Sequence, residues 1–469
     1  MDKGYSWQIA VIFTFGETAG SGLVALPHSI VSLGYFLGGI TLFLMCLIPF
    51  YTASLLGNNW LLMKKRWKND YIVHCRNPYP EMAEKAIGVK MRHFTSFCIY
   101  TTTFGGGAVF SLLAAKTLSS VLNSFGVNIS VCTMLLAVGV ILWPFVMLKS
   151  PMNFWQVSIV AAVSTIAAVV LILSGYVFDS DKCYENAFYP EIKISSLPNS
   201  LATIVFAYGG HPCIPTIVHD MKSPQHCRRA FIFCYIGLFL LYTPVSLMGY
   251  GIYGDSLTDS VIESLQNVSI SRACSFLIAI HVFFSILIIV NPLLQASEQV
   301  LNIKQEFGIG RFLTRTCIFG SIIIVAATVP NFGLVVNIVG GSILPILVLI
   351  LPPVFSICLE IDDDYLNDKP HTFNMTVSKV WNNHNRYRLL LDVIIIVLGV
   401  WIMLHSTTNS MHSLFIADNA TAKSCFLEIF SANTNNESIF NSSSLSYQMK
   451  CCGTYKNISS SNTHCFIEK

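Results

Sequence analysis

Runs of about 20 mostly apolar residues recur along nearly the whole 469-residue chain, and this pattern restricts the fold more than any other feature. Only 11% of the residues are charged, whereas soluble domains carry about 25%. A helix needs about 20 apolar residues to cross the hydrocarbon core of a bilayer. The pattern therefore predicts an all-α polytopic membrane protein. The sequence pI near 8.1 reflects loop lysines and arginines and does not indicate nucleic-acid binding.

We expect eleven transmembrane helices. Their approximate ranges are 8–31, 33–57, 95–122, 131–149, 154–178, 200–220, 229–251, 273–300, 313–330, 332–359 and 389–411. If the N-terminus is cytoplasmic, 20 lysines and arginines fall in inner segments and 7 in outer segments. Cytoplasmic loops carry the excess of basic residues, so this distribution predicts a cytoplasmic N-terminus and an extracellular or luminal C-terminus.

The composition changes after the last span and divides the chain into two parts. Residues 1–411 hold the spans, and residues 412–469, rich in Ser, Asn and Cys, are expected to form a glycosylated outer tail. Six outer sequons are candidate glycosylation sites: Asn128, Asn267, Asn419, Asn436, Asn441 and Asn457. The cysteines expected outside, where disulfides can form, are Cys183, Cys425, Cys451, Cys452 and Cys465. Their number is odd and their pairing stays open.

The first span is interrupted by Gly16-Glu17-Thr18-Ala19-Gly20-Ser21-Gly22. Each glycine weakens a helix by about 1 kcal/mol relative to alanine. Backbone groups that are opened at this depth cannot face lipid, because no water is available to bond them. The segment therefore predicts a broken helix that faces a cavity.

The sixth span repeats this feature at Phe206-Ala207-Tyr208-Gly209-Gly210-His211-Pro212. Proline removes a backbone donor and clashes one turn back, so a continuous helix is not expected here. The two interrupted spans are five apart and cross the membrane in opposite directions. Matching breaks in two five-span halves are typical of an inverted-repeat transporter.

These motifs resemble those of the amino acid/auxin permease family, which includes proton- and sodium-coupled amino acid transporters. The resemblance rests on residues 20–27, on residues 206–211 with the turn at 221–224, on residues 79–88, and on residues 344–353. It covers about residues 5–411 and leaves 412–469 unmatched. It implies a LeuT-type fold, in which spans 1–5 and 6–10 form inverted repeats and one further helix follows.

An amino acid substrate is a zwitterion, so a buried site must offer donors to its carboxylate and acceptors to its ammonium group. The second half of a broken helix presents free N–H groups, and the first half exposes carbonyls. We expect the substrate to bind at both breaks. The candidate residues are Thr18, Ala19, Gly20, Ser21, Gly22, Phe206, Ala207, Tyr208, Gly209 and Gly210.

The candidates for proton coupling or gating are Glu17 and His211 at the breaks, His281 in the eighth span, and Glu298 where that span reaches the inner face. The alternative for His211 is a bond to a local carbonyl, and the alternatives for Glu298 are an ion pair with a nearby basic residue and simple solvation. Ser285 is a weaker candidate for sodium binding. Glu17 favours cationic substrates if it is ionised, and a structural ion pair is its alternative role. Lys116, near the outer end of its span, is expected to snorkel to the membrane interface.

We therefore expect a secondary active transporter of amino acids, most plausibly small neutral ones because the glycine-rich site is narrow. Proton coupling is favoured over sodium coupling. An amino acid sensor that transports little, or a sodium-coupled or cationic amino acid transporter, is the alternative. No enzyme motif, cofactor or metal spacing is present, and the expected partners are the amino acid and the lipid bilayer. The plasma membrane and a lysosomal or vesicular endomembrane fit equally well.

Overall fold

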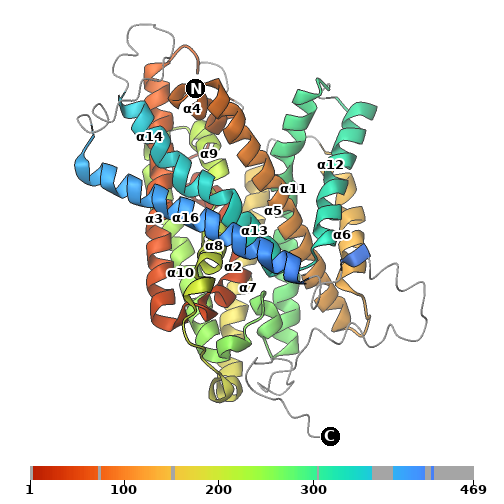
Figure 1. Cartoon of the computed structure of the whole chain (residues 1–469). Coiled ribbons are helices and arrows are strands. Elements are labelled where there is room, and N and C mark those ends of the chain that lie inside the picture. The colour runs from red at the N-terminus through yellow and green to blue at the C-terminus, as the bar shows by residue number, and fades with distance from the viewer. Residues whose placement is uncertain are drawn as a thin grey trace, which may run out of the picture.

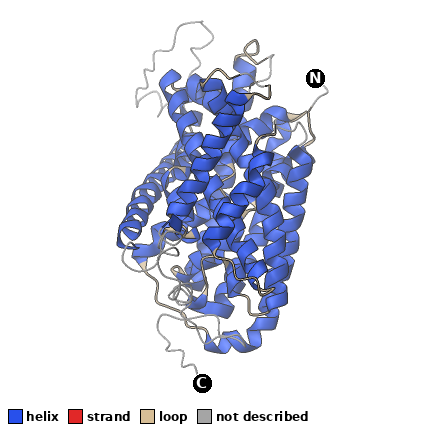
Figure 2. Ribbon diagram, turned by 90° about the vertical axis from the view of Figure 1, so that its right-hand side faces the viewer, coloured by secondary structure: helices blue, strands red, loops and turns tan. Residues whose placement is uncertain are grey.

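The computed structural model describes residues 4–71, 75, 77–148, 154–303, 306–361, 384–417 and 424–426. Within these residues every regular element is a helix, and the one β-type contact is a single bridge between Tyr5 and Met221. Figure 2 shows the helices packed side by side in one elongated bundle. The expected all-α fold class is confirmed.

The first span consists of two helices. Helix α1 (Trp7–Thr18) ends at the break, and α2 (Ser21–Val31) continues at an angle of 56°. The threonine hydroxyl at the end of α1 bonds back to its own helix, from Thr18 Oγ1 to the Thr14 carbonyl at 2.7 Å. Ala19 and Gly20 are left between the two helices. The interruption predicted from the glycines is therefore present.

The sixth span is interrupted in the same way. Helix α8 (Leu197–Ala207) ends before Tyr208, a short 3₁₀ turn η3 follows at His211–Cys213, and α9 (Ile214–Asp220) completes the span. Pro212 and Pro215 lack the backbone N–H that would continue α8. The second break thus lies where the proline and glycines predict it.

The other expected spans overlap helices that extend beyond the expected ends in most cases. They are α3 (Gly34–Arg66), α5 (Val89–Asn123), α6 (Val131–Val146), α7 (Phe154–Cys183), α10 (Cys227–Tyr253), α11 (Val268–Val300), α12 (Ile309–Thr328), α13 (Phe332–Ser342) with α14 (Leu351–Ile361), and α16 (Arg386–Ala417). Between α13 and α14 the chain forms a π-helical turn at Ile346–Ile350.

The described residues contain nine helices that are long and apolar enough to cross a membrane, or ten if α1 and α2 count as one span. Helix α6 has 16 residues and falls short of the length that a straight span requires. The count of eleven spans therefore stays a prediction.

A short helix, α4 (Pro78–Ala86), lies at the end of the bundle where α5 begins (Figure 1). Its Tyr79 hydroxyl donates to the Leu347 carbonyl at 2.6 Å, inside the π-helical turn. The π-helical turn frees carbonyls from the regular helical pattern, and one of them accepts this bond. The long inner loop is thereby attached to the tenth span.

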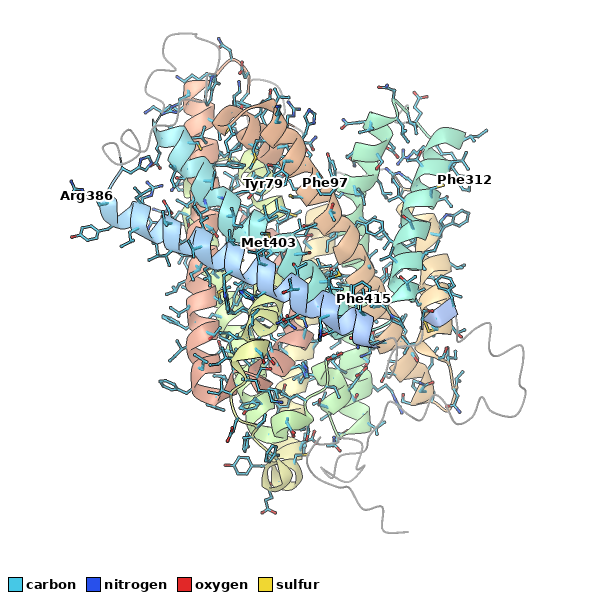
Figure 3. The ribbon with its side chains drawn as sticks, viewed as in Figure 1. Tyr79, Phe97, Phe312, Arg386, Met403 and Phe415 are labelled. Atoms are coloured by element: carbon cyan, nitrogen blue, oxygen red, sulfur yellow. A yellow bond between two sulfur atoms is a disulfide. The ribbon has the colours of Figure 1, made fainter. Side chains whose placement is uncertain are left out.

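Helix α16 runs obliquely across α13 and α14 (Figure 1), and Figure 3 follows it from Arg386 through Met403 to Phe415. Near its start Arg388 pairs with Glu360 at 2.7 Å. Toward its end Asn409 Nδ2 donates to the Ser195 carbonyl, close to the start of α8, at 3.0 Å. The additional helix therefore packs on the outside of the second broken span.

Two cysteines of distant segments form a disulfide, Cys132 at the start of α6 and Cys425. Cys183 is also disulfide-bonded. Disulfide participation of Cys425 and Cys183 agrees with their expected outer position. Cys132 is not among the five cysteines that were expected outside, because it falls within the predicted span 131–149, one residue after the start of α6. Cys451, Cys452 and Cys465 lie outside the described residues.

Candidate functional site

The two helix breaks lie against each other. A Cβ atom on Gly22 would overlap the backbone of Ala207, and a Cβ atom on Gly210 would overlap the hydroxyl of Thr18. Glycine at both positions therefore allows the two interrupted helices to touch at backbone distance. Segments almost 190 residues apart meet in this way, as the pairing of interrupted spans predicted.

A tyrosine of the seventh span joins the two breaks. The Tyr242 hydroxyl lies 3.0 Å from the Thr18 carbonyl and 2.9 Å from the Ala207 carbonyl, so it donates between the last carbonyls of α1 and α8. The side chain is fully buried. Tyr242 was not among the predicted site residues. A tyrosine in the middle of an apolar span does indicate a hydrogen bond to another segment, because its hydroxyl requires a partner when buried.

The start of α2 offers donors without an internal acceptor. Gly20 is the N-cap residue and has no side chain to bond the first N–H groups of the helix. Ser21 Oγ is buried and has no hydrogen-bond partner within the described part of the chain. A buried hydroxyl is rarely left unbonded in a native protein. Together with the positive end of the helix dipole, these groups suit an anion such as a carboxylate.

His281 of α11 lies next to this start. Its Nε2 atom would be 2.8 Å from a Cβ at Gly20, and it is 3.1 Å from the Ser285 hydroxyl. Its Nδ1 atom lies 2.9 Å from Thr165 Oγ1 of α7. Thr165 in turn donates to the Ala19 carbonyl at 3.1 Å. Two of the sequence candidates, His281 and Ser285, are therefore at the break, and Thr165 is a further residue that the sequence did not reveal.

His211 is close in sequence to the second break but is bonded to the surrounding scaffold. Its Nε2 atom lies 2.9 Å from the Thr52 hydroxyl of α3, and the side chain is fully buried. The histidine is therefore held by a hydrogen bond to a different span.

Glu17 occupies the last turn of α1 and is partly buried. Within the described residues it makes no hydrogen bond or ion pair, and it interacts electrostatically with Cys213 at the start of α9. Glu17, in the last turn of α1, is therefore near Cys213, the residue that precedes α9.

Glu298 is not part of the breaks. It is 17 residues after His281 on α11, about 25 Å away at ~1.5 Å per residue. Its carboxylate pairs with Arg315 at 2.5 Å and Arg311 at 3.4 Å. Arg315 also donates to the Val146 carbonyl at the end of α6 at 2.7 Å. Glu298 thus joins the inner ends of three helices through a buried ion-pair network.

The remaining candidates occupy the second break. A Cβ atom on Gly209 would contact Leu344 at 2.6 Å, and Phe206 packs against Gly340 of α13. The Tyr208 ring lies edge-on to Tyr242, with centroids 5.0 Å apart. These residues therefore form the wall between the break and the tenth span.

The residues at the two breaks are buried. Ala19, Ala207 and Tyr208 are 0% exposed, which shields the breaks from solvent. Lys116, for which snorkelling was predicted, pairs with Glu263 at 3.1 Å. Tyr5 donates its hydroxyl to the Ile217 carbonyl of α9 at 2.8 Å and so joins the start of the chain to the second broken span.

Most predicted glycosylation sites cannot be examined in the structure. Asn128 is exposed in the loop before α6. Asn267 caps α11, and its side-chain oxygen accepts from the backbone N–H groups of Ser269 and Ile270. Asn419, Asn436, Asn441 and Asn457 lie outside the described residues, so glycosylation stays a prediction.

A family model described as "Transmembrane amino acid transporter protein" matches residues 3–412. The chain belongs to this family. Membership confirms the resemblance to amino acid permeases, and the family and its relatives are transporters and not enzymes. Together with the apolar helices, it makes the chain an integral, multi-pass membrane protein.

Curated relatives of this family member come from Arabidopsis thaliana. Amino acid transporter AVT1C is 24% identical over 367 residues, which are 75% of this chain and 63% of that protein. Amino acid transporter ANT1 is 22% identical over 411 residues, which are 84% of this chain and 89% of that protein. Lysine histidine transporter-like 1 is 24% identical, with 88% and 89% covered. The chain thus spans less than two thirds of AVT1C.

Among solved structures, MhsT in complex with L-phenylalanine is similar, with a TM-score of 0.56 and 9% identity. The match covers 87% of this chain and 100% of that chain. At this identity the likeness concerns the fold alone. It confirms the LeuT-type architecture that the resemblance implied.

Proposed function

We propose that this chain is a secondary active transporter of amino acids, with small neutral amino acids as its main substrates. The observation that supports this most directly is the start of α2, where an uncapped helix N-terminus and the unpartnered Ser21 hydroxyl adjoin the second helix break. Relatives named as amino acid transporters support the substrate class.

The carboxylate of the substrate would bind at Gly20, Ser21 and Gly22, where backbone N–H groups and one hydroxyl act as donors. The ammonium group would bind carbonyl oxygens at the ends of α1 and α8. Small substrates are favoured because glycines 22 and 210 bring the two breaks into contact and leave little volume between them.

The transport cycle would work by alternating access, because an amino acid can reach the buried breaks only when the helices open toward one side of the membrane at a time. Different contacts hold the two sides, the Lys116–Glu263 pair on the predicted outer side and the Tyr5–Ile217 bond on the predicted inner side. Breaking one set while the other holds would expose the site to one compartment.

Proton coupling is favoured over sodium coupling. His281 lies beside Gly20 and Glu17 lies in the last turn of α1, so two ionisable groups are close to the first break, whereas Ser285 bonds to a histidine and not to an open carbonyl. If Glu17 is ionised with substrate bound, cationic amino acids would also be accepted. The expected membrane is the plasma membrane or a lysosomal or vesicular membrane, with the C-terminus on the extracellular or luminal side.

The test uses the full-length protein in proteoliposomes, with radiolabelled amino acids supplied at two pH values, with and without sodium. Gly20→Leu should abolish binding and exchange, because even a Cβ at this position would be 2.8 Å from His281. Gly320→Leu is the matched control, since no atom lies within 4 Å of a Cβ on this glycine of α12. Uptake retained by Gly20→Leu would contradict the site.

An amino acid sensor is the second candidate function, because the inner loop is attached to the tenth span through Tyr79. Its mark would be amino acid binding without exchange in the same proteoliposomes. That outcome would replace the transporter proposal.

A further inference from the structure

His281 is a titratable side chain of α11 that lies against the first helix break. Its Nε2 atom lies 2.8 Å from the position of a Cβ on Gly20. Its ring stacks on Phe110 of α5 with centroids 6.4 Å apart, and the residue is 1% exposed. Nε2 therefore faces the start of α2, where the carboxylate is proposed to bind.

Neighbouring groups determine which ring nitrogen carries the proton. Nδ1 lies 3.1 Å from the Ala161 carbonyl, which can only accept. Nδ1 therefore bears the hydrogen. Thr165 Oγ1, 2.9 Å from Nδ1, uses its own hydrogen toward the carbonyls of Ala161 or Ala19. In the neutral ring Nε2 is then a lone-pair acceptor, and the Ser285 hydroxyl donates to it.

We propose that Nε2 of His281 binds the proton that is co-transported with the amino acid, and that the resulting imidazolium donates to the substrate carboxylate beside Gly20. The inference deepens the proposed function and rests on it. Protonation adds one hydrogen to Nε2 and breaks no bond of the amino acid. This hydrogen is then shared between the carboxylate and the Ser285 hydroxyl, which accepts where before it donated, and release of the proton restores the first arrangement.

Such a site couples the two ligands through charge. A buried imidazolium without a counter-charge costs free energy, and so does a buried carboxylate without a cation. Bound together they form a charge-assisted hydrogen bond at the positive end of α2. Each ligand therefore increases the affinity for the other, and the effect is reciprocal.

The hydrogen-bond partners of His281 in the described structure are all neutral. Other titratable groups on the elements packed against it face different partners. On α5, Lys116 pairs with Glu263, and on α7, Asp179 accepts from Tyr253 and Tyr176 donates to the Val245 carbonyl. On α11 itself, Cys274 donates to the Ala168 carbonyl and Glu298 pairs with Arg315. On α1, Glu17 interacts with Cys213.

The experiment measures two quantities on full-length protein in proteoliposomes. One is exchange of a mixture of glycine, alanine, serine and proline across the membrane, which needs no net proton movement. The other is the proton flux that the same mixture evokes, followed with a pH dye inside the vesicles. His281→Gln keeps a donor and an acceptor but cannot titrate. His405→Gln on α16 is the control, because this histidine is exposed and stacks on Trp401.

We expect His281→Gln to retain exchange and lose at least nine tenths of the evoked proton flux, while His405→Gln keeps both. Evoked proton flux in His281→Gln equal to that of the wild type overturns the proposal. Exchange without any evoked proton flux in the wild type overturns it too, although amino acid transport would stand. If the wild-type protein shows no amino acid binding and no exchange, the proposed function itself is refuted.

If His281→Gln also loses exchange, Ser285→Ala decides, since it leaves the histidine in place. Loss of the hydroxyl beside Nε2 should move the pH midpoint of apparent substrate affinity to lower pH by about half a unit or more, because an acceptor of the imidazolium is removed. An unchanged midpoint overturns the proposal.

Discussion

Replacing Tyr242 with phenylalanine removes one hydroxyl from the contact between the two broken helices. That hydroxyl lies 3.0 Å from the Thr18 carbonyl and 2.9 Å from the Ala207 carbonyl. The ring itself would stay in place, because it is fully buried and packs edge-on against Tyr208. The substitution therefore tests the hydrogen bond and leaves the packing unchanged.

The expected loss of affinity follows from the hydrogen bonds that each carbonyl retains after the substitution. Thr18 retains the Gly20 N–H at 2.9 Å, whereas Ala207 loses the only partner that its carbonyl has in the described structure. A buried polar group without a partner costs about 1–3 kcal/mol. If the bond holds the two breaks in the substrate-binding arrangement, the same free energy weakens apparent affinity by about 5- to 150-fold.

The assay compares Tyr242→Phe with Tyr176→Phe. The Tyr176 hydroxyl donates to one carbonyl, that of Val245 at 3.0 Å, and is equally buried but away from the breaks. Thermal unfolding in detergent should show a similar loss of stability in both variants. Amino acid exchange in proteoliposomes should show reduced affinity only in Tyr242→Phe. Equal affinity in the two variants would refute the role assigned to Tyr242.

Three further changes test other parts of the chain. Ser21→Ala should lower substrate affinity about 3- to 10-fold without loss of thermal stability, since its hydroxyl has no partner in the described residues. Ser410→Ala, at an equally buried serine, is the control and should leave affinity unchanged. A lower unfolding temperature for Ser21→Ala but not for Ser410→Ala would contradict the assumption that the Ser21 hydroxyl has no structural partner. Glu17→Gln should alter the pH profile or the charge preference of uptake, and no change in either assigns Glu17 a structural role. Cys132→Ser and Cys425→Ser should lower the unfolding temperature equally, and additive losses in the double variant would show that the bond is not shared.

The breaks themselves could be predicted because their causes are local. Glycines at 20 and 22 and prolines at 212 and 215 disfavour a continuous helix wherever they occur in a span. Helix α4, with proline at its start and Gly88 after its end, has the same kind of local cause. Features of this kind depend on residues a few positions apart.

The groups that complete the site could not be predicted because they come from distant helices. Tyr242 and Thr165 lie in spans whose periodicity shows only that they are buried, and their partners are 224 and 146 positions away. The Cys132–Cys425 disulfide joins residues 293 positions apart. The bond between His211 and Thr52 of α3 is also distant in sequence, so the position of His211 next to a break did not reveal it.

The lone pairs of the carbonyls at the two breaks indicate how an ammonium group would bind in the proposed site. Each carbonyl oxygen can accept two hydrogen bonds. Thr18 already accepts two, from Gly20 and Tyr242, whereas Ala19 and Ala207 each accept one in the described structure. The acceptors for an ammonium group are thus partly occupied but held in fixed directions.

The hydrogen-bond donors at the start of α2 have fewer partners than these carbonyls. Ser21 Oγ has no hydrogen-bond partner in the described residues, and the N-terminus of α2 has no side-chain cap. Leaving a buried hydroxyl unbonded costs free energy that a bound ligand can recover. Under the proposed function that ligand group is the carboxylate, which all α-amino acids share, so this part of the site would bind them alike.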